Sequence, residues 1–183
     1  MKAILSLLVL TLSFSVWSKN PIVVIETNMG AIEVELNEEK APETVKNFMS
    51  YVNDKFYDGT IFHRVINGFM IQGGGMDDKM QEKKTKPPFK KHESQNGLKN
   101  ETGTIAMART ADPLSATSQF FINVNDNSSL DYPSPDGHGY AVFGKVTTGM
   151  HVVNRIKMVK TGNLGGHSNV PMDTVLIKSI KKK

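Results

Sequence analysis

Beyond residue 20 the chain consists mostly of short runs in which apolar and polar positions alternate. In the run 31–36, Ile32, Val34 and Leu36 alternate with two glutamates, a pattern typical of a strand with one buried and one exposed face. The letters NMG join this run to an apolar run at 21–27, as in a β-hairpin. Six further runs predict strands, at 60–66, 69–74, 103–108, 119–124, 140–146 and 173–180.

Two segments show helical spacing instead. Segment 41–54 has apolar residues three and four positions apart, and Pro42 suits its first turn. Segment 147–159 repeats this spacing through Val153 and Ile156. Eight strands with two isolated helices, no repeats and no linker predict a mainly β fold: an eight-stranded antiparallel closed barrel capped by two α-helices. We expect one domain over 19–183, an ordinary length for a single core.

The first 18 residues follow a different pattern. A single lysine, Lys2, precedes an apolar run that ends near residue 16, and two small residues, Val16 and Ser18, close the segment. This is the layout of a secretory signal peptide, and the run is shorter than the roughly 20 apolar residues of a membrane-spanning helix. An uncleaved anchor is the alternative. We expect cleavage at 18, followed by release into the bacterial periplasm without further membrane contact; secretion is the alternative.

Composition and charge remove several kinds of chemistry. The chain has no cysteine, which excludes disulfides, thiolate chemistry and a lipid attached to sulfur. Its net charge is +4, and lysines concentrate in segment 77–93 and at the C-terminus. Such a loop could bind nucleic acid or acidic lipid. Four carboxylates interrupt the basic run, so we expect a solvated loop and no nucleic-acid partner.

Familiar catalytic motifs are also missing from the sequence. There is no G-x-S-x-G motif, and the five histidines show no metal-ligand spacing. The triple glycine at 73–75 lacks the Lys and Ser/Thr that would follow in a phosphate-binding loop. It is better explained by tight backbone packing at a strand end. We therefore expect neither a metal nor a cofactor.

One arginine, Arg64, stands in the strongly apolar segment 62–75, FHRVINGFMIQGGG. A guanidinium stays protonated at working pH, so it is a poor general base. Burying this charge without a partner costs on the order of several kcal/mol. Arg64 therefore either meets a structural carboxylate or points at a substrate.

Four segments in this order and spacing resemble the cyclophilin family of peptidyl-prolyl cis–trans isomerases. They are FHRVINGFMIQGG, GTIAMAR, SATSQFFINV and YAVFGKV. The similarity runs from about residue 22 to residue 180 and is greatest to the short, exported bacterial members. It implies an eight-stranded barrel with two capping helices. It also implies an enzyme that rotates X-Pro bonds and assists folding of exported proteins, and we expect it to be a monomer.

The chemistry of that reaction gives Arg64 a role. Rotation about a peptide bond is opposed by partial C–N double-bond character, a barrier of about 18 to 20 kcal/mol. A donor against the prolyl nitrogen would stabilise its lone pair as the bond twists. Reaching the millisecond range requires on the order of 5 to 6 kcal/mol of such differential binding. A permanently charged donor in a water-poor pocket supplies part of it without proton transfer.

The resemblance implies roles for nine further residues. An apolar floor holds the proline ring, one glutamine steadies Arg64 and meets the peptide backbone, and a ledge carries the extended peptide. The residues assigned to catalysis are Arg64, Phe69, Gln72, Phe121 and Tyr140, and those assigned to substrate binding are Met70, Ala108, Arg109, Gln119 and Leu130.

Three positions depart from the family pattern. Arg109 stands where asparagine is frequent; the backbone contacts the peptide there, so the change is expected mainly to alter charge beside the groove. Tyr140 replaces a frequent histidine, and its hydroxyl can serve as the donor; His138 is less well placed. Ser129 stands where drug-sensitive members have tryptophan, so weak cyclosporin binding is expected.

Two other classes of function remain open at the level of sequence. A non-catalytic module could bind proline-containing segments or act as a chaperone, although Arg64 and Phe121 are both present. A ligand-carrying barrel of the lipocalin kind would need a roomy interior. Five aromatic side chains are expected to fill this one: Phe62, Phe69, Phe120, Phe121 and Phe143.

Overall fold

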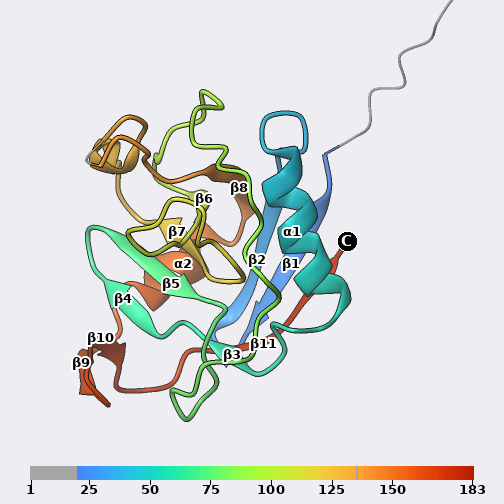
Figure 1. The fold of residues 1–183 in the computed structure, drawn as a ribbon. Helices are drawn as coiled ribbons and strands as arrows, with labels where there is room; N and C mark the ends of the chain where they lie inside the picture. The colour runs from blue at the N-terminus through green and yellow to red at the C-terminus, as the bar shows by residue number, and fades with distance from the viewer. Residues whose placement is uncertain (1–19, 135) are drawn as a thin grey trace, which may run out of the picture.

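The computed structural model describes residues 20–134 and 136–183. The predicted signal peptide at 1–18 lies outside these residues. One antiparallel sheet dominates the molecule, with strand order β3-β11-β1-β2-β8-β6-β7-β5-β4 (Figure 1). Its strands are β1 (Ile22–Thr27), β2 (Gly30–Leu36), β3 (Thr60–Ile61), β4 (Arg64–Ile66), β5 (Met70–Gly73), β6 (Thr104–Met107), β7 (Phe120–Asn123), β8 (Val142–Thr148) and β11 (Leu176–Lys182).

The two edge strands of this sheet follow one another in the sequence. β3 pairs with β11, where Ile61 is opposite Leu176, and β4 pairs with β5, where Arg64 is opposite Gln72. Only residues 62 and 63 separate the two strands, so the segment joins the edges of the curled sheet. The mainly β fold with two helices is confirmed. The sheet has nine strands rather than eight because the predicted strand 60–66 changes partner in its middle.

Both predicted helices are present. α2 (Met150–Ile156) buries Val152, Val153 and Ile156. α1 (Pro42–Asn53) begins at a proline, and its N-cap residue, Ala41, offers no side-chain cap. A short 3₁₀ helix, η1 (Ser128–Leu130), precedes β8. Across the described ranges, no helix is long and apolar enough to cross a bilayer.

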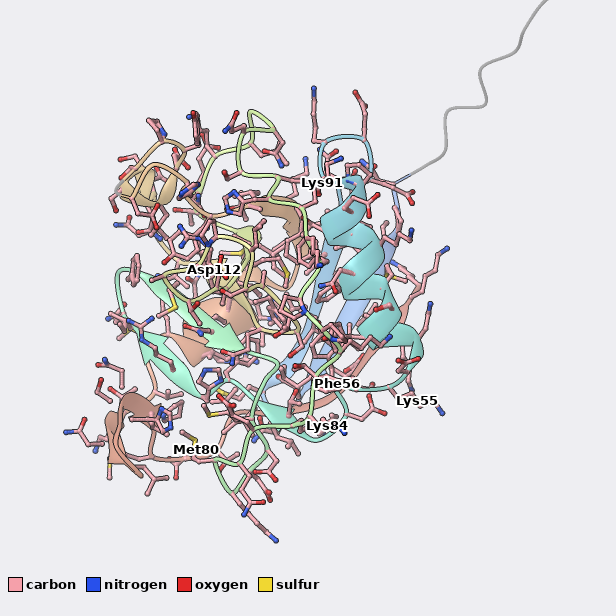
Figure 2. All side chains as sticks on the ribbon, in the orientation of Figure 1. Lys55, Phe56, Met80, Lys84, Lys91 and Asp112 are labelled. Atoms are coloured by element: carbon pink, nitrogen blue, oxygen red, sulfur yellow. The ribbon has the colours of Figure 1, made fainter. Side chains whose placement is uncertain are left out.

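The lysine-rich loop, residues 77–98, is attached to both ends of α1. At the start of the helix the Glu93 carboxylate accepts hydrogen bonds from the backbone N–H groups of Glu43 (3.2 Å) and Thr44 (2.9 Å), donors that have no partner within the helix. At the other end Lys86 pairs with Asp54 at 2.7 Å. Figure 2 shows Lys84 and Lys91 toward opposite ends of α1. Part of this lysine-rich loop therefore stabilises the fold. Lys86 lies at the C-terminal end of α1, and the partial negative charge of a helix C-terminus favours a cation.

A separate hairpin was not predicted. β9 (Thr161–Leu164) and β10 (His167–Pro171) pair with each other across Gly165 and Gly166, a turn pair that favours hairpins. Their sequence is polar and glycine-rich, without the alternation that identified the other strands. The hairpin packs beside β4 (Figure 1).

The interior of the curled sheet is filled by aromatic side chains, as expected, but two of the five predicted ones lie elsewhere. Phe62, Phe120 and Phe143 belong to the main core with residues of both helices. Phe69 and Phe121 belong to a second apolar cluster. Successive side chains of a strand point to opposite faces, so Phe120 and Phe121 cannot both point inward. The filled interior excludes the ligand-carrying barrel.

Candidate functional site

A pocket of about 490 Å³ lies over the outer face of β4, β5 and β7. Strand register places its side chains there: Arg64 is opposite Gln72, Gln72 is opposite Phe121, and Phe121 is opposite Ala106. The intervening residues on these strands, including Ile71, point into the main core. The barrel core therefore serves as a rigid support for the pocket.

The floor of the pocket is the second apolar cluster, which is smaller and separate from the main core. Its buried members include Met70, 2% exposed, and Phe121, 4% exposed. Four of its partly buried members also line the pocket, namely Phe69, Ala108, Leu130 and Tyr140. The floor therefore offers an apolar surface to a ligand while its rim remains accessible to solvent.

Arg64 is held by a chain of two glutamines. Its Nη1 donates to Gln72 Oε1 at 3.3 Å, and Gln72 Nε2 donates to Gln119 Oε1 at 3.0 Å. Gly75 makes room for this arrangement, since a Cβ at that position would collide with the Gln119 side chain. Among the ion pairs of residues 20–134 and 136–183, none involves Arg64. Arg64 therefore meets no structural carboxylate within these residues, and the other role, facing a substrate, stays a prediction.

The prediction that Arg109 mainly alters charge beside the groove is not what the structure shows. Its side chain is only 2% exposed and pairs with Asp136 at 2.6 Å. The guanidinium also donates to the Gly139 carbonyl from Nε (3.0 Å) and Nη2 (2.8 Å). Arg109 as a whole is only half-buried. Since its side chain is almost fully buried, the part of the residue that solvent reaches is its main chain. The side chain instead holds the loop that carries Tyr140.

Tyr140 lies between this arginine and Phe121. Its ring is stacked 4.5 Å from Arg109 Cζ and meets the Phe121 ring edge-on, with centroids 5.7 Å apart. Its backbone N–H donates to the Leu130 carbonyl at 2.8 Å. The exposed His138 does not line the pocket; its ring faces His92, with centroids 6.0 Å apart. Tyr140 is therefore the better placed donor of the two.

Two histidines of the pocket were not singled out from the sequence. His63 is 5% exposed and its Nδ1 has no hydrogen-bond partner within the described residues. Burial, and then the charges of His167 and Arg64, lower the pKa of His63 to about 4. His167 is exposed and reaches the pocket from β10. The position of His63 beside Arg64 was a usable signal, whereas His167 is brought in only by tertiary structure.

All ten predicted site residues line this one pocket. Their individual roles stay predictions. Ser129 is exposed on η1 and outside the lining, and weak cyclosporin binding likewise stays a prediction. Within the described chain no group of three or more His, Asp or Glu side chains could hold a metal ion.

Comparisons with known proteins agree on one family. Residues 22–182 match the family model described as cyclophilin type peptidyl-prolyl cis-trans isomerase/CLD. A peptidyl-prolyl cis-trans isomerase of Streptomyces antibioticus is 56% identical over 159 residues, 86% of this chain and 95% of the relative. Peptidyl-prolyl cis-trans isomerase B of Escherichia coli K12 is 55% identical over 160 residues, 86% and 97% of the two chains.

Solved structures show the same relationship. A cyclophilin type peptidyl-prolyl cis-trans isomerase of Cryptosporidium parvum superposes with a TM-score of 0.73 at 28% sequence identity, covering 90% of this chain and 98% of the other. A second structure of that protein, obtained in the presence of the dipeptide Ala-Pro, gives a TM-score of 0.72 at 28% identity, with 88% and 98% coverage.

Proposed function

The chain belongs to the cyclophilin family of peptidyl-prolyl cis–trans isomerases, and on this premise we propose that it rotates X-Pro bonds in the pocket around Arg64. The observation that supports this proposal is that the Arg64 guanidinium is oriented by hydrogen bonds but, within the described residues, not neutralised. It is oriented by Gln72 and Gln119, lies beside an apolar floor and has no carboxylate partner in the described chain. A charge arranged in this way before the substrate arrives requires little reorganisation during the reaction.

The reaction needs no proton transfer and no broken covalent bond. As the X-Pro bond twists, amide resonance is lost and the prolyl nitrogen becomes pyramidal, with a localised lone pair. An N–H group of Arg64 donates to this lone pair in the twisted state and interacts weakly with the planar amide. Binding that is stronger in the transition state than in the ground state accelerates the step.

The other residues position the peptide for this rotation. Met70, Phe121 and Leu130 form the surface on which the proline ring packs, because they are apolar and lie on the pocket floor. The main chain at Ala108 and Arg109 supports the extended peptide. The Tyr140 hydroxyl donates to a substrate carbonyl beside the twisting bond.

The test is the exchange rate between cis and trans forms of a short X-Pro peptide, measured by NMR. Arg64→Ala is expected to lower kcat/KM by roughly 2 to 4 kcal/mol of transition-state stabilisation, the scale of one deleted oxyanion donor. Arg64→Lys should recover little, because an ammonium lacks the planar fork. Arg155→Ala is the control: Arg155 lies on α2, outside the pocket. Parental exchange rates in Arg64→Ala would contradict the proposal.

We further infer that the substrates are proline-containing segments of exported proteins that fold in the periplasm. The layout of residues 1–18 supports this inference, as does the similarity to bacterial isomerases. The mature protein is expected to begin near Lys19. N-terminal sequencing of the protein purified from the periplasmic fraction checks this, and a retained Met1 would contradict it.

A further inference from the structure

The pocket runs across the strands of the sheet, so its two ends are different. At one end lies the ledge, where the Ala108 N–H donates to the Gln119 carbonyl at 3.0 Å. The lining then passes from β7 to β5 and β4, and beyond β4 lies the β9–β10 hairpin. A peptide that follows this lining from the ledge as far as β4 therefore ends beside the hairpin.

The hairpin end gathers three nitrogen-bearing side chains, those of His63, Arg64 and His167. The rotation described above uses only Arg64. No Asp or Glu lines the pocket, and among the described residues no hydrogen bond or ion pair involves the His167 side chain. This end of the pocket is therefore rich in hydrogen-bond donors and has no negatively charged side chain to accept from them.

Hairpin folding alone does not account for His167. Its backbone is opposite Leu164 in the β9–β10 register, a pairing that any side chain at this position would allow. The β10 residues that anchor the hairpin are instead Val170 and Pro171, which are buried. The His167 imidazole is exposed at the pocket rim, where it can meet a bound peptide.

Resting on the proposed function of the pocket, we propose that its hairpin end is a subsite for an acidic side chain of the substrate, with His167 as the specificity-determining residue. A carboxylate accepts hydrogen bonds from imidazole and guanidinium N–H groups, and such charge-assisted bonds are the stronger class. In this binding mode a substrate residue close to the proline meets His167, since each residue of an extended chain adds about 3.3 Å. The preferred substrates carry Asp or Glu on the side of the proline that lies nearer the hairpin.

The experiment compares X-Pro peptides that carry Glu, Gln or Lys either shortly before or shortly after the proline, using NMR exchange rates. The parent enzyme is expected to turn over the Glu peptide about fivefold faster than the Gln peptide, equivalent to ~1 kcal/mol, on one flank only. His167→Ala should lose this preference and turn over the Glu and Gln peptides at equal rates. His167→Glu should favour the Lys peptide instead.

A matched control separates local contact from long-range attraction by a basic protein. His151 is exposed on α2 and does not line the pocket, so His151→Ala should keep the full preference for Glu. Equal rates for Glu and Gln peptides in the parent would overturn the proposal. So would a preference that persists in His167→Ala.

Failure of the underlying function gives a different result. If Arg64→Ala turned over every peptide at the parental rate, the pocket would not be the active site, whatever the charge preference. If Arg64→Ala lost turnover while the Glu and Gln peptides stayed equal in the parent, only the acidic subsite would be wrong. The NMR spectrum of each variant shows directly whether it has folded.

Discussion

The chain places two of its arginines around the same pocket and uses them in opposite ways. Arg109 directs its guanidinium to the carbonyls of Gly139 and Thr110 and to the Asp136 carboxylate. Arg64 makes one side-chain hydrogen bond within the described residues, to Gln72. Five N–H donors are available on each guanidinium. Arg109 therefore has a structural role, whereas Arg64 retains donors for a ligand.

His63 is expected to make stability depend on pH. Burial holds its pKa at about 4 in the folded state, against about 6.5 in the unfolded chain. As the pH falls below about 6.5, the unfolded state gains a proton that the folded state does not bind until about pH 4. The free energy of unfolding should therefore fall across this window, by up to about 3 kcal/mol, and level off above it.

Urea denaturation followed by circular dichroism at pH 7 and pH 4.5 tests this expectation. His63→Gln should show a smaller loss between the two pH values than the parent. Some loss should remain, because burial also lowers the pKa of His92. His151→Gln, at an exposed position, should behave like the parent. An unchanged loss in His63→Gln would show that His63 does not carry the effect.

At the scale of elements, the loop before β8 depends on one carboxylate. Asp136 pairs with Arg109 and accepts hydrogen bonds from the backbone N–H groups of His138 (3.0 Å) and Gly139 (3.3 Å). The Arg109 hydrogen bond, followed by that of His138, lowers the pKa of Asp136 to about 2. The pKa of Asp136 is therefore lower in the folded protein than in the unfolded chain. The contacts of its carboxylate stabilise the fold above the unfolded pKa and are lost only as the pH falls through about 2. The loop should therefore remain intact at pH 4.

Asp136→Asn is expected to loosen this loop and, through Arg109, the position of Tyr140. Peptide KM should rise roughly threefold while overall stability changes little, since a solvent-accessible ion pair contributes little to folding. Asp126→Asn is the matched control, because Asp126 holds the Thr102 N–H at 2.8 Å in another loop. Steady-state kinetics of both variants give the comparison. Equal KM values in Asp136→Asn and the parent would rule out this positioning role.

At the scale of the whole molecule, we expect two neighbouring phenylalanines of β7 to affect different properties: Phe120 mainly stability and Phe121 mainly activity. Phe120 is fully buried and meets the rings of Tyr57 (5.6 Å) and Phe48 (5.7 Å) in the main core. Phe121 faces the pocket from the smaller cluster. Phe120→Ala should cost about 3 to 5 kcal/mol of stability, as for other buried phenylalanines. Phe121→Ala should cost less stability and more of kcat/KM.

Urea denaturation and NMR exchange rates of the two variants test this separation. If Phe120→Ala does not fold, Phe120→Leu, which removes less volume, should still lose more stability than activity. Phe121→Leu provides the matched substitution on the opposite face. A larger loss of stability in Phe121→Leu than in Phe120→Leu would contradict the assignment of the two faces.

Much of this architecture could be predicted from the sequence because it depends on contacts between near neighbours. Alternation such as Ile32, Val34 and Leu36 shows which residues share a strand face, and three- and four-residue spacing shows the helices. The placement of Arg64 in an apolar run, together with the resemblance of four segments to one family, named ten of the thirteen residues that line the pocket and missed His63, Met76 and His167. Local pattern thus determined the helices and most strands of the large sheet, whereas the other predicted site residues came from the family resemblance.

Only the tertiary structure decided how these parts face one another. Period-two alternation cannot say which face of β7 is inside, so Phe121 was assigned both to the core and to the site. The break within 60–66 arises because its two ends pair with different distant strands. The burial of Arg109 and the approach of His167 depend on loops that lack periodicity and meet the pocket from far along the chain. Such long-range pairing leaves no mark in the local pattern, because it is determined by the packing of the completed sheet.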